Sequence, residues 1–181
     1  MKAVIVGCGR VGAGLADELD RAGWQVLILD RVSAAFDRLP SSFGGTALRG
    51  DGTDEDTLRR AGAEGADLFL ALTEGDNRNI MAAQLGIEAL GAKWTMAKCN
   101  DPVRAEAYAH LGIATVCRTN LMTTAILDHL GQATPAHSGI YAPTSHHAHT
   151  ATVAASALGA GATASGAAGV GSAGGTTPTE A

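Results

Sequence analysis

Three glycines near the N-terminus have the spacing of a phosphate-binding turn. They lie in the stretch Gly7-Cys8-Gly9-Arg10-Val11-Gly12, which follows a short apolar run at residues 3–6. Gly7 would allow a tight turn between a strand and a helix, and Gly9 would let a diphosphate approach the backbone without meeting a Cβ atom. Gly12 would let the helix pack closely on the strand. The N–H groups and the dipole at the start of that helix would form the anion site.

An acidic residue follows at the distance that a dinucleotide-binding unit requires. A helical pattern of leucines and alanines leads to a second apolar run at residues 26–29, which ends on Asp30. At a strand end, this carboxylate would accept hydrogen bonds from ribose hydroxyls. In a chain with 24 glycines, three of them can have this spacing by chance. The order of strand, turn, helix and acid is nevertheless the full fingerprint, so the stretch predicts nucleotide binding.

Arg31 leaves two interpretations open, because its side chain would either lie over the adenine or face solvent. In some nucleotide-binding proteins a basic residue here recognises a 2′-phosphate, usually where the acid has been lost. Asp30 is retained and would repel that phosphate. The sequence therefore favours NAD or an adenine nucleotide over NADP.

A second polar group follows the strand predicted at residues 46–49. Gly50 and Gly52 suit a strand end where the backbone comes close to a ligand. Asp51 either stabilises this turn or contacts the adenine end of the ligand, since ligands bind at the carboxyl ends of parallel strands. Thr53 or Asp54 would cap the helix predicted at residues 55–61.

A third polar loop, at residues 73–79, follows a nearly continuous apolar run at residues 66–72. Such a run is typical of a parallel strand buried on both faces. Thr73 and Asn79 are candidates for contacts with a ribose or phosphate, although capping is the commoner role of such residues. Asp76 or Asn77 would cap the helix predicted at residues 80–90.

Strands alternate with helices as far as residue 130, with further strands predicted at residues 94–98 and 112–117. This alternation predicts an α/β fold, a Rossmann-like, doubly wound parallel sheet of six strands with helices on both faces. We expect this domain to span residues 1–131. A linker with histidines and prolines would follow at 132–150, and a disordered tail rich in Gly, Ala, Ser and Thr at 151–181. A linker without fixed geometry predicts no metal site.

Composition and charge exclude several classes of protein. The net charge of −5, without a basic stripe, argues against nucleic acid as a partner. No apolar run has the length of a transmembrane helix, and the N-terminus lacks the features of a signal peptide, so we expect a cytoplasmic protein. The spacing of Cys8, Cys99 and Cys117 indicates neither a disulfide framework nor a zinc site. Cys8 is either a redox-sensitive thiol at a helix start or a small residue that fits the turn.

A series of motifs in a fixed order extends beyond the glycines, at residues 4–12, 29–30, 50–53, 71–79, 98–101 and 112–116. Together they resemble the N-terminal nucleotide-binding domain, known as RCK, KTN or TrkA-N, of proteins that regulate potassium conductance and Trk/Ktr-type potassium uptake. The resemblance covers about residues 1–131. Family members usually carry a second, C-terminal ligand-binding domain, whereas this sequence continues into the Gly/Ala-rich segment.

The resemblance implies a sensor. NAD(H) or ATP/ADP would bind, the assembly would change shape, and a membrane-embedded potassium channel or transporter would respond. The protein would thus lie at the inner face of the cell membrane through its partner. The helix predicted from Asn120 to Leu130 would form a homo-oligomer. The implied site comprises the phosphate-binding turn, a ribose contact, the adenine side and the far end of the ligand: Gly7, Gly9, Arg10, Val11, Gly12, Asp30, Arg31, Asp51, Gly52, Thr53 and Thr73.

A small NAD-dependent oxidoreductase is the alternative function. Such an enzyme needs a substrate domain and a general acid or base beside the nicotinamide. His110 and His129 fall in predicted helices, the other histidines lie in the linker, and there is no Tyr-x-x-x-Lys pair. We therefore predict that the protein is not an enzyme. A third possibility, an assembly module that has lost its ligand, is weakened by the intact glycines and Asp30.

Overall fold

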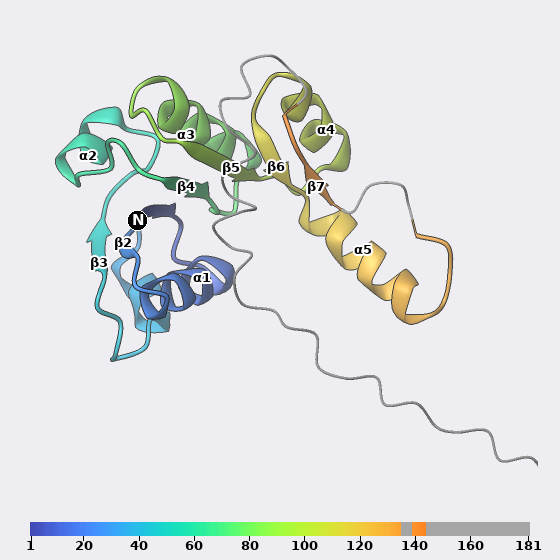
Figure 1. The fold of residues 1–181 in the computed structure, drawn as a ribbon, viewed down its shortest axis with the longest axis horizontal. Helices are drawn as coiled ribbons and strands as arrows, with labels where there is room; N and C mark the ends of the chain where they lie inside the picture. Colours follow the sequence, from blue (N-terminus) through green and yellow to red (C-terminus); the bar gives the residue numbers. More distant parts are fainter. Residues whose placement is uncertain (135–138, 144–181) are drawn as a thin grey trace, which may run out of the picture.

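The computed structural model describes residues 1–134 and 139–143 of the chain. Strands and helices alternate along it, as Figure 1 shows. In chain order the elements are β1 (Lys2–Val6), α1 (Arg10–Arg21), β2 (Gln25–Asp30), η1 (Ser33–Arg38), β3 (Thr46–Arg49), α2 (Glu55–Arg60), β4 (Leu68–Ala71), α3 (Asp76–Glu88), β5 (Trp94–Lys98), α4 (Pro102–His110), β6 (Ala114–Val116), α5 (Arg118–His129) and β7 (Ile140–Tyr141).

One sheet holds all the described strands in the order β3-β2-β1-β4-β5-β6-β7. The pairs from β3 to β6 are parallel. The chain winds outward from β1 in one direction through β2 and β3, and in the other through β4, β5 and β6. The strand order therefore reverses between β1 and β4, and the Rossmann-like, doubly wound fold is confirmed.

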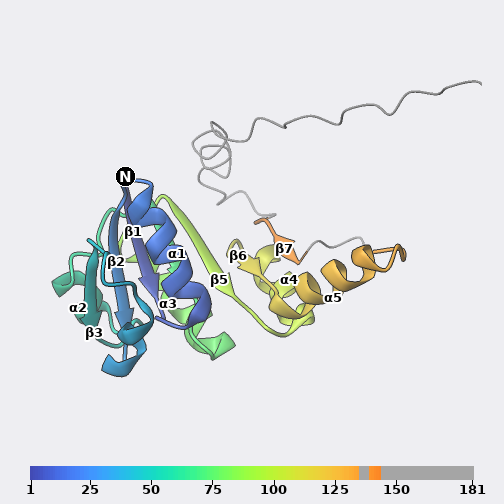
Figure 2. The same ribbon diagram turned by 90° about the horizontal axis from the view of Figure 1, so that it is seen from below.

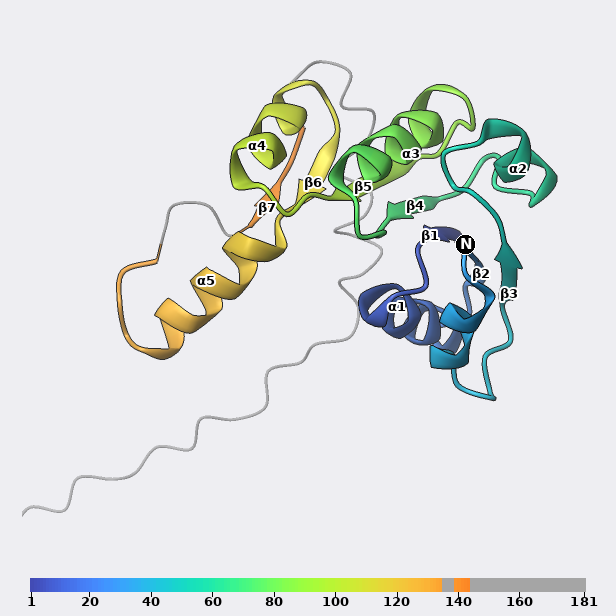
Figure 3. The same cartoon turned by 180° about the vertical axis from the view of Figure 1, so that it is seen from behind.

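Alternate residues along the strands build two cores, one on each face of the sheet. Val4 and Leu29 pack on one face with residues of α2 and α3. Ile5 and Ile28 pack on the opposite face with residues of α1 and η1. Helices thus cover both faces, and in Figures 1 and 3 α3 and α1 lie on opposite sides of the sheet. This arrangement leaves the carboxyl ends of the strands free to form a site.

The sheet has a seventh strand that the sequence analysis did not predict. β7 pairs antiparallel with β6, with Tyr141 opposite Thr115, and the Tyr141 hydroxyl accepts a hydrogen bond from Asn120 Nδ2 at 2.6 Å. Two residues are too few to produce a periodic pattern, so the prediction of six strands was wrong by this one. β7 lies within residues 132–150, predicted as a linker. The structure does not describe residues 135–138 and 144–150 of the predicted linker, nor the predicted tail at 151–181. The limits of the linker and the tail therefore stay predictions.

Several helix limits differ from those predicted. α3 begins at Asp76, before the predicted start at residue 80, and Gly75 is its N-cap, so neither Asp76 nor Asn77 caps it. α5 begins at Arg118, buries none of its residues and extends away from the body of the sheet, as Figure 2 shows. Within the described part of the chain, no helix is long and apolar enough to cross a membrane.

Candidate nucleotide-binding site

A cavity of about 660 Å³ lies at the carboxyl ends of β1, β2, β3 and β4. This is the edge where the strand order reverses, which is the usual ligand position in doubly wound folds. Its wall contains residues from the glycine turn, from η1 and from the loops that follow β2, β3 and β4. They are Val6, Gly7, Cys8, Gly9, Leu29, Asp30, Arg31, Val32, Ala34, Ala35, Arg38, Arg49, Gly50, Asp51, Gly52, Leu72, Thr73, Glu74 and Arg78.

The glycine turn has the geometry that the spacing predicts. Gly7 has φ +107°, and a Cβ atom there would lie 2.9 Å from backbone atoms of Leu72 and Thr73. A Cβ atom on Gly12 would lie 2.0 Å from the carbonyl oxygen of Gly7, so a side chain would push α1 away from the turn. A Cβ atom on Gly9 would meet nothing within 4 Å.

The start of α1 has open donors. Gly9 is its N-cap, and within residues 1–134 and 139–143 no side-chain cap hydrogen bond is made to its first turn. Free N–H groups at a helix start, next to a cavity, provide the donors that a phosphate needs.

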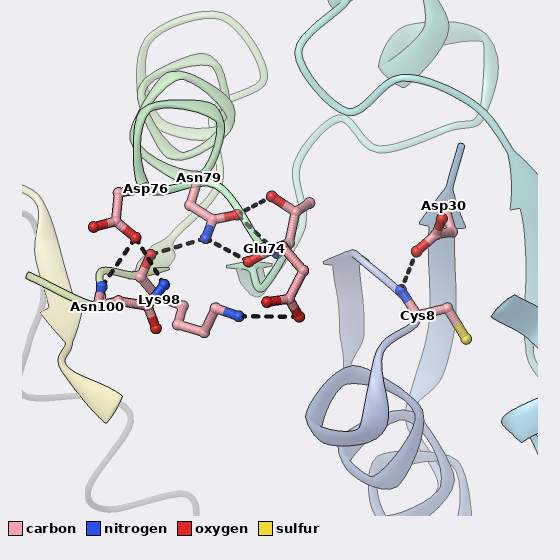
Figure 4. Close-up of polar contacts among 8 residues, drawn as sticks. Cys8, Asp30, Glu74, Asp76, Asn79, Lys98 and Asn100 are labelled. Atoms are coloured by element: carbon pink, nitrogen blue, oxygen red, sulfur yellow. Dashed lines mark hydrogen bonds and ion pairs between the residues drawn. The ribbon is translucent and has the colours of Figure 1, made fainter. Parts of the chain in front are cut away.

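Asp30 joins β2 to the glycine turn. Its Oδ2 accepts a hydrogen bond from the Cys8 N–H at 2.8 Å, and its Oδ1 accepts one from the Val32 N–H at 2.9 Å, as Figure 4 shows for Cys8. A carboxylate has about four acceptor positions, so ribose hydroxyls can still donate to it.

Cys8 fits the turn as a small residue. Burial raises the pKa of its thiol, and the Asp30 carboxylate raises that pKa further. A redox-sensitive thiol needs a lowered pKa, so this environment favours the structural interpretation of Cys8.

Asp51 stabilises its own turn and also lines the cavity. Its Oδ1 accepts hydrogen bonds from the Thr53 hydroxyl at 2.7 Å and the Thr53 N–H at 3.0 Å, which together lower the pKa of Asp51. The Arg31 guanidinium lies 3.6 Å from the other carboxylate oxygen. Both interpretations of Asp51 are therefore compatible with its position.

Four of the proposed site residues lie outside the wall of this cavity. The Thr53 hydroxyl donates a hydrogen bond to the Asp51 carboxylate, and Gly12 packs against Gly7 of the glycine turn. Val11 is 56% exposed. Arg10 lines a second, smaller cavity of about 350 Å³ together with Arg38. Gly52 does line the main cavity, and a Cβ atom there would lie 2.1 Å from Val6, which requires glycine for packing.

Beyond β4, Asn79 connects two strand ends. It is fully buried, and its Oδ1 accepts hydrogen bonds from the N–H and the hydroxyl of Thr73 at 2.7 and 2.6 Å. Its Nδ2 donates to the carbonyls of Thr73 and Lys98 at 2.9 and 2.8 Å. Figure 4 shows these contacts between the loop after β4 and the end of β5. Asn79 thus holds Thr73 at the cavity wall, while its own amide group is hydrogen-bonded to Thr73 and Lys98.

Three arginines of the cavity wall are not among the binding residues predicted from the sequence. Arg38 comes from η1, Arg49 is the last residue of β3, and Arg78 lies in the first turn of α3. The strand-end position of Arg49, opposite Asp30 in the sheet, was the signal that could have identified it. With Arg31, the wall carries four guanidinium groups against the three carboxylates of Asp30, Asp51 and Glu74. This excess of positive charge, in a chain of net charge −5, suits an anionic ligand.

Comparisons with known proteins identify relatives of this chain. A family model described as the TrkA-N domain matches residues 3–119. The Trk system potassium uptake protein TrkA of Streptomyces coelicolor is 50% identical over 116 residues, which are 64% of this chain and 52% of that protein. The chain thus spans about half the length, or less, of the curated relatives that it matches.

Solved structures with the same fold include two with bound nucleotides. Shewanella denitrificans Kef CTD in AMP-bound form has a TM-score of 0.57 and 23% identity, covering 74% of this chain and 84% of that chain. The GsuK channel bound to NAD has a TM-score of 0.57 and 17% identity, covering 70% of this chain and 23% of that chain. Identity at this level supports the fold alone.

Proposed function

Because this chain belongs to the TrkA-N domain family, we propose that it regulates a potassium channel or a Trk/Ktr-type potassium transporter by binding a nucleotide. The ligand is NAD(H) or ATP/ADP, and the membrane-embedded transport protein is the partner. The regulatory protein then lies on the cytoplasmic side, at the inner face of the cell membrane. The name of the Streptomyces relative and the GsuK channel support this assignment.

The observation that carries the proposal is the cavity itself. It combines a glycine turn, the uncapped start of α1 and an excess of guanidinium groups with a carboxylate at the end of β2. The first three attract a diphosphate, and Asp30 accepts from a ribose. The AMP and NAD in the two solved structures support a ligand that contains adenosine. The binding residues proposed are those of the sequence analysis, with Arg38, Arg49 and Arg78 added.

We assign α5 to association with a second copy of the chain. The helix buries none of its residues, and its large apolar side chains Leu121, Met122 and Ile126 are exposed, as is Leu130 at its C-cap. A row of exposed apolar side chains on a projecting helix is typical of a protein interface. A homo-oligomer would join two nucleotide sites in one assembly, so that ligand binding could change its shape.

We also propose that the protein is not an enzyme. The cavity wall, among the described residues, contains no histidine, tyrosine or lysine that could act as a general acid or base. His110 and His129 are the last residues of α4 and α5. The name of the Streptomyces relative, a potassium uptake protein of the Trk system, supports the same conclusion.

Thermal-shift titration of the purified chain with NAD, NADH, NADP, ATP and ADP tests the proposal. A ligand that binds only the folded state raises the melting temperature with concentration. We expect stabilisation by NAD(H) or by ATP and ADP, and a weaker effect of NADP because Asp30 repels a 2′-phosphate. Absence of a shift with all five ligands would show that the glycine turn is structural here. Oxidation of NADH with an added keto substrate, or reduction of NAD with an added hydroxy substrate, would instead favour the oxidoreductase.

A further inference from the structure

The end of β5 places a lysine beside the cavity without lining it. Lys98 is 8% exposed, and its Nζ lies 3.7 Å from Oε1 of Glu74. The Glu74 side chain is 84% exposed and forms part of the cavity wall. Figure 4 shows the Lys98 side chain extending toward this carboxylate. The pair therefore presents an acid to the cavity and holds a buried cation behind it.

The position of the pair corresponds to one particular part of a bound nucleotide. The glycine turn follows β1, Asp30 ends β2, and Glu74 lies in the loop after β4, on the other side of β1. A nucleotide with its diphosphate at the glycine turn and its ribose at Asp30 would extend past the diphosphate toward Glu74. Asn79 fixes this region, since it binds the backbone of both Thr73 and Lys98.

We propose that Glu74, positioned by Lys98, selects the group that a nucleotide carries beyond its diphosphate, and that it favours a dinucleotide over a nucleoside triphosphate. The inference rests on the proposed function and adds a specificity to it. The Glu74 carboxylate repels a third phosphate and accepts hydrogen bonds from the hydroxyls of a second ribose. Repulsion of the wrong ligand is a common source of specificity.

Lys98 acts through Glu74. Its buried ammonium group attracts the carboxylate and limits the repulsion that the carboxylate exerts on a phosphate. Removal of the Glu74 charge should therefore raise the affinity for ATP, and removal of the Lys98 charge should lower it. Neither removal affects ADP, because ADP ends at the diphosphate.

Calorimetric titration of the full chain with NADH, ATP and ADP tests the inference. In Glu74→Gln we expect the affinity for ATP relative to NADH to rise about fivefold, and in Lys98→Met to fall by a similar factor. Lys98→Arg keeps the positive charge, so its ratio of ATP to NADH affinity should equal that of the unmutated chain. Glu106→Gln, which removes an exposed carboxylate on α4, is the matched control for net charge and should leave the ratio unchanged.

The outcomes separate this inference from the function on which it rests. If the unmutated chain binds ADP but Glu74→Gln changes the ATP-to-NADH ratio by less than about twofold, the specificity role is wrong and the proposed function stands. If the unmutated chain binds none of the three ligands, both are wrong. Should Lys98→Met fail to fold, Glu74→Gln decides alone, because it changes a side chain that is 84% exposed and keeps its size.

Discussion

The carboxylate of Asp30 accepts a hydrogen bond from the backbone N–H of Cys8 at 2.8 Å, which ties the end of β2 to the glycine turn after β1. The same carboxylate lines the cavity, so one side chain both holds the glycine turn and is available for the proposed ribose contact. This double role makes Asp30 a direct test of the proposed binding.

Replacement of Asp30 by alanine should weaken the binding of NADH and ATP by about tenfold or more, because a charge-assisted acceptor is lost and the turn is released. Calorimetric titration would measure the change. Asp37→Ala is the control, since Asp37 is exposed on η1 and does not line the cavity. Equal affinity in the unmutated chain and Asp30→Ala would contradict the ribose contact.

Two glycines of α1 should respond oppositely to alanine. In Gly12→Ala the new Cβ atom would lie 2.0 Å from the Gly7 carbonyl oxygen, so we expect a loss of at least about 2 kcal/mol of unfolding free energy. In Gly14→Ala it would meet nothing within 4 Å, and the higher helix propensity of alanine should add about 0.5–1 kcal/mol. Urea unfolding would measure the free energy of unfolding of both variants. A similar change in the two variants would refute the close packing of α1 on the glycine turn.

Asp76 should stabilise the fold at neutral pH and lose this effect in acid. Burial raises the pKa of Asp76, but hydrogen bonds from the N–H groups of Asn100 and Asp101 outweigh burial and lower it overall. A lowered pKa contributes stability above the unfolded value of about 3.9, and that contribution disappears as the pH falls through the folded value.

Asp76→Ala should therefore cost about 1–2 kcal/mol at pH 7, and this cost should begin to fall near about pH 4 and decrease further toward about pH 2. Urea unfolding of the two proteins across this range would measure the difference. The exposed Asp37→Ala should show no such trend. A difference that stayed constant with pH would mean that the charge of Asp76 is irrelevant to its contacts.

Association through α5 should fail when charge is placed on its apolar side chains. We expect the unmutated chain to have the mass of a dimer or larger oligomer, and Met122→Glu and Ile126→Glu to be monomers, because a carboxylate would be buried in the interface. Size-exclusion chromatography with light scattering would measure the masses. Met81→Glu is the control, since Met81 is 51% exposed on α3 and Met122 59% on α5. A monomeric unmutated chain would contradict the assignment.

The local parts of the site could be predicted from the sequence. The turn at Gly7, the close packing of Gly12 and the strand-end position of Asp30 all depend on residues within one β-α-β unit, where spacing determines geometry. The fold class was predictable for the same reason, since alternating strands and helices allow few topologies. The resemblance to the TrkA-N domain family was visible in the same motifs, and the match over residues 3–119 confirms it.

Contacts between distant segments were not predictable. Asp76 looked like a helix cap, but its carboxylate accepts hydrogen bonds from Asn100, 24 residues away, and Gly75 precedes the helix instead. The resemblance implies a contact between Arg10 and a phosphate, and this contact stays a prediction, because Arg10 lines the smaller cavity beside α1 together with Arg38. A side chain's direction depends on packing that the local pattern does not contain.

The sequence by itself determined the β-α-β unit, its glycines and the acid that ends its second strand, because the spacing of residues along one short segment specifies them. Only the tertiary structure decided which charged groups meet at the cavity. Arg38, Arg49 and Arg78 come from three separate elements and share a wall only once the sheet is assembled. The same holds for Lys98 and Glu74, which stand on neighbouring strand ends, and for Tyr141, whose two-residue strand exists only through its pairing with β6.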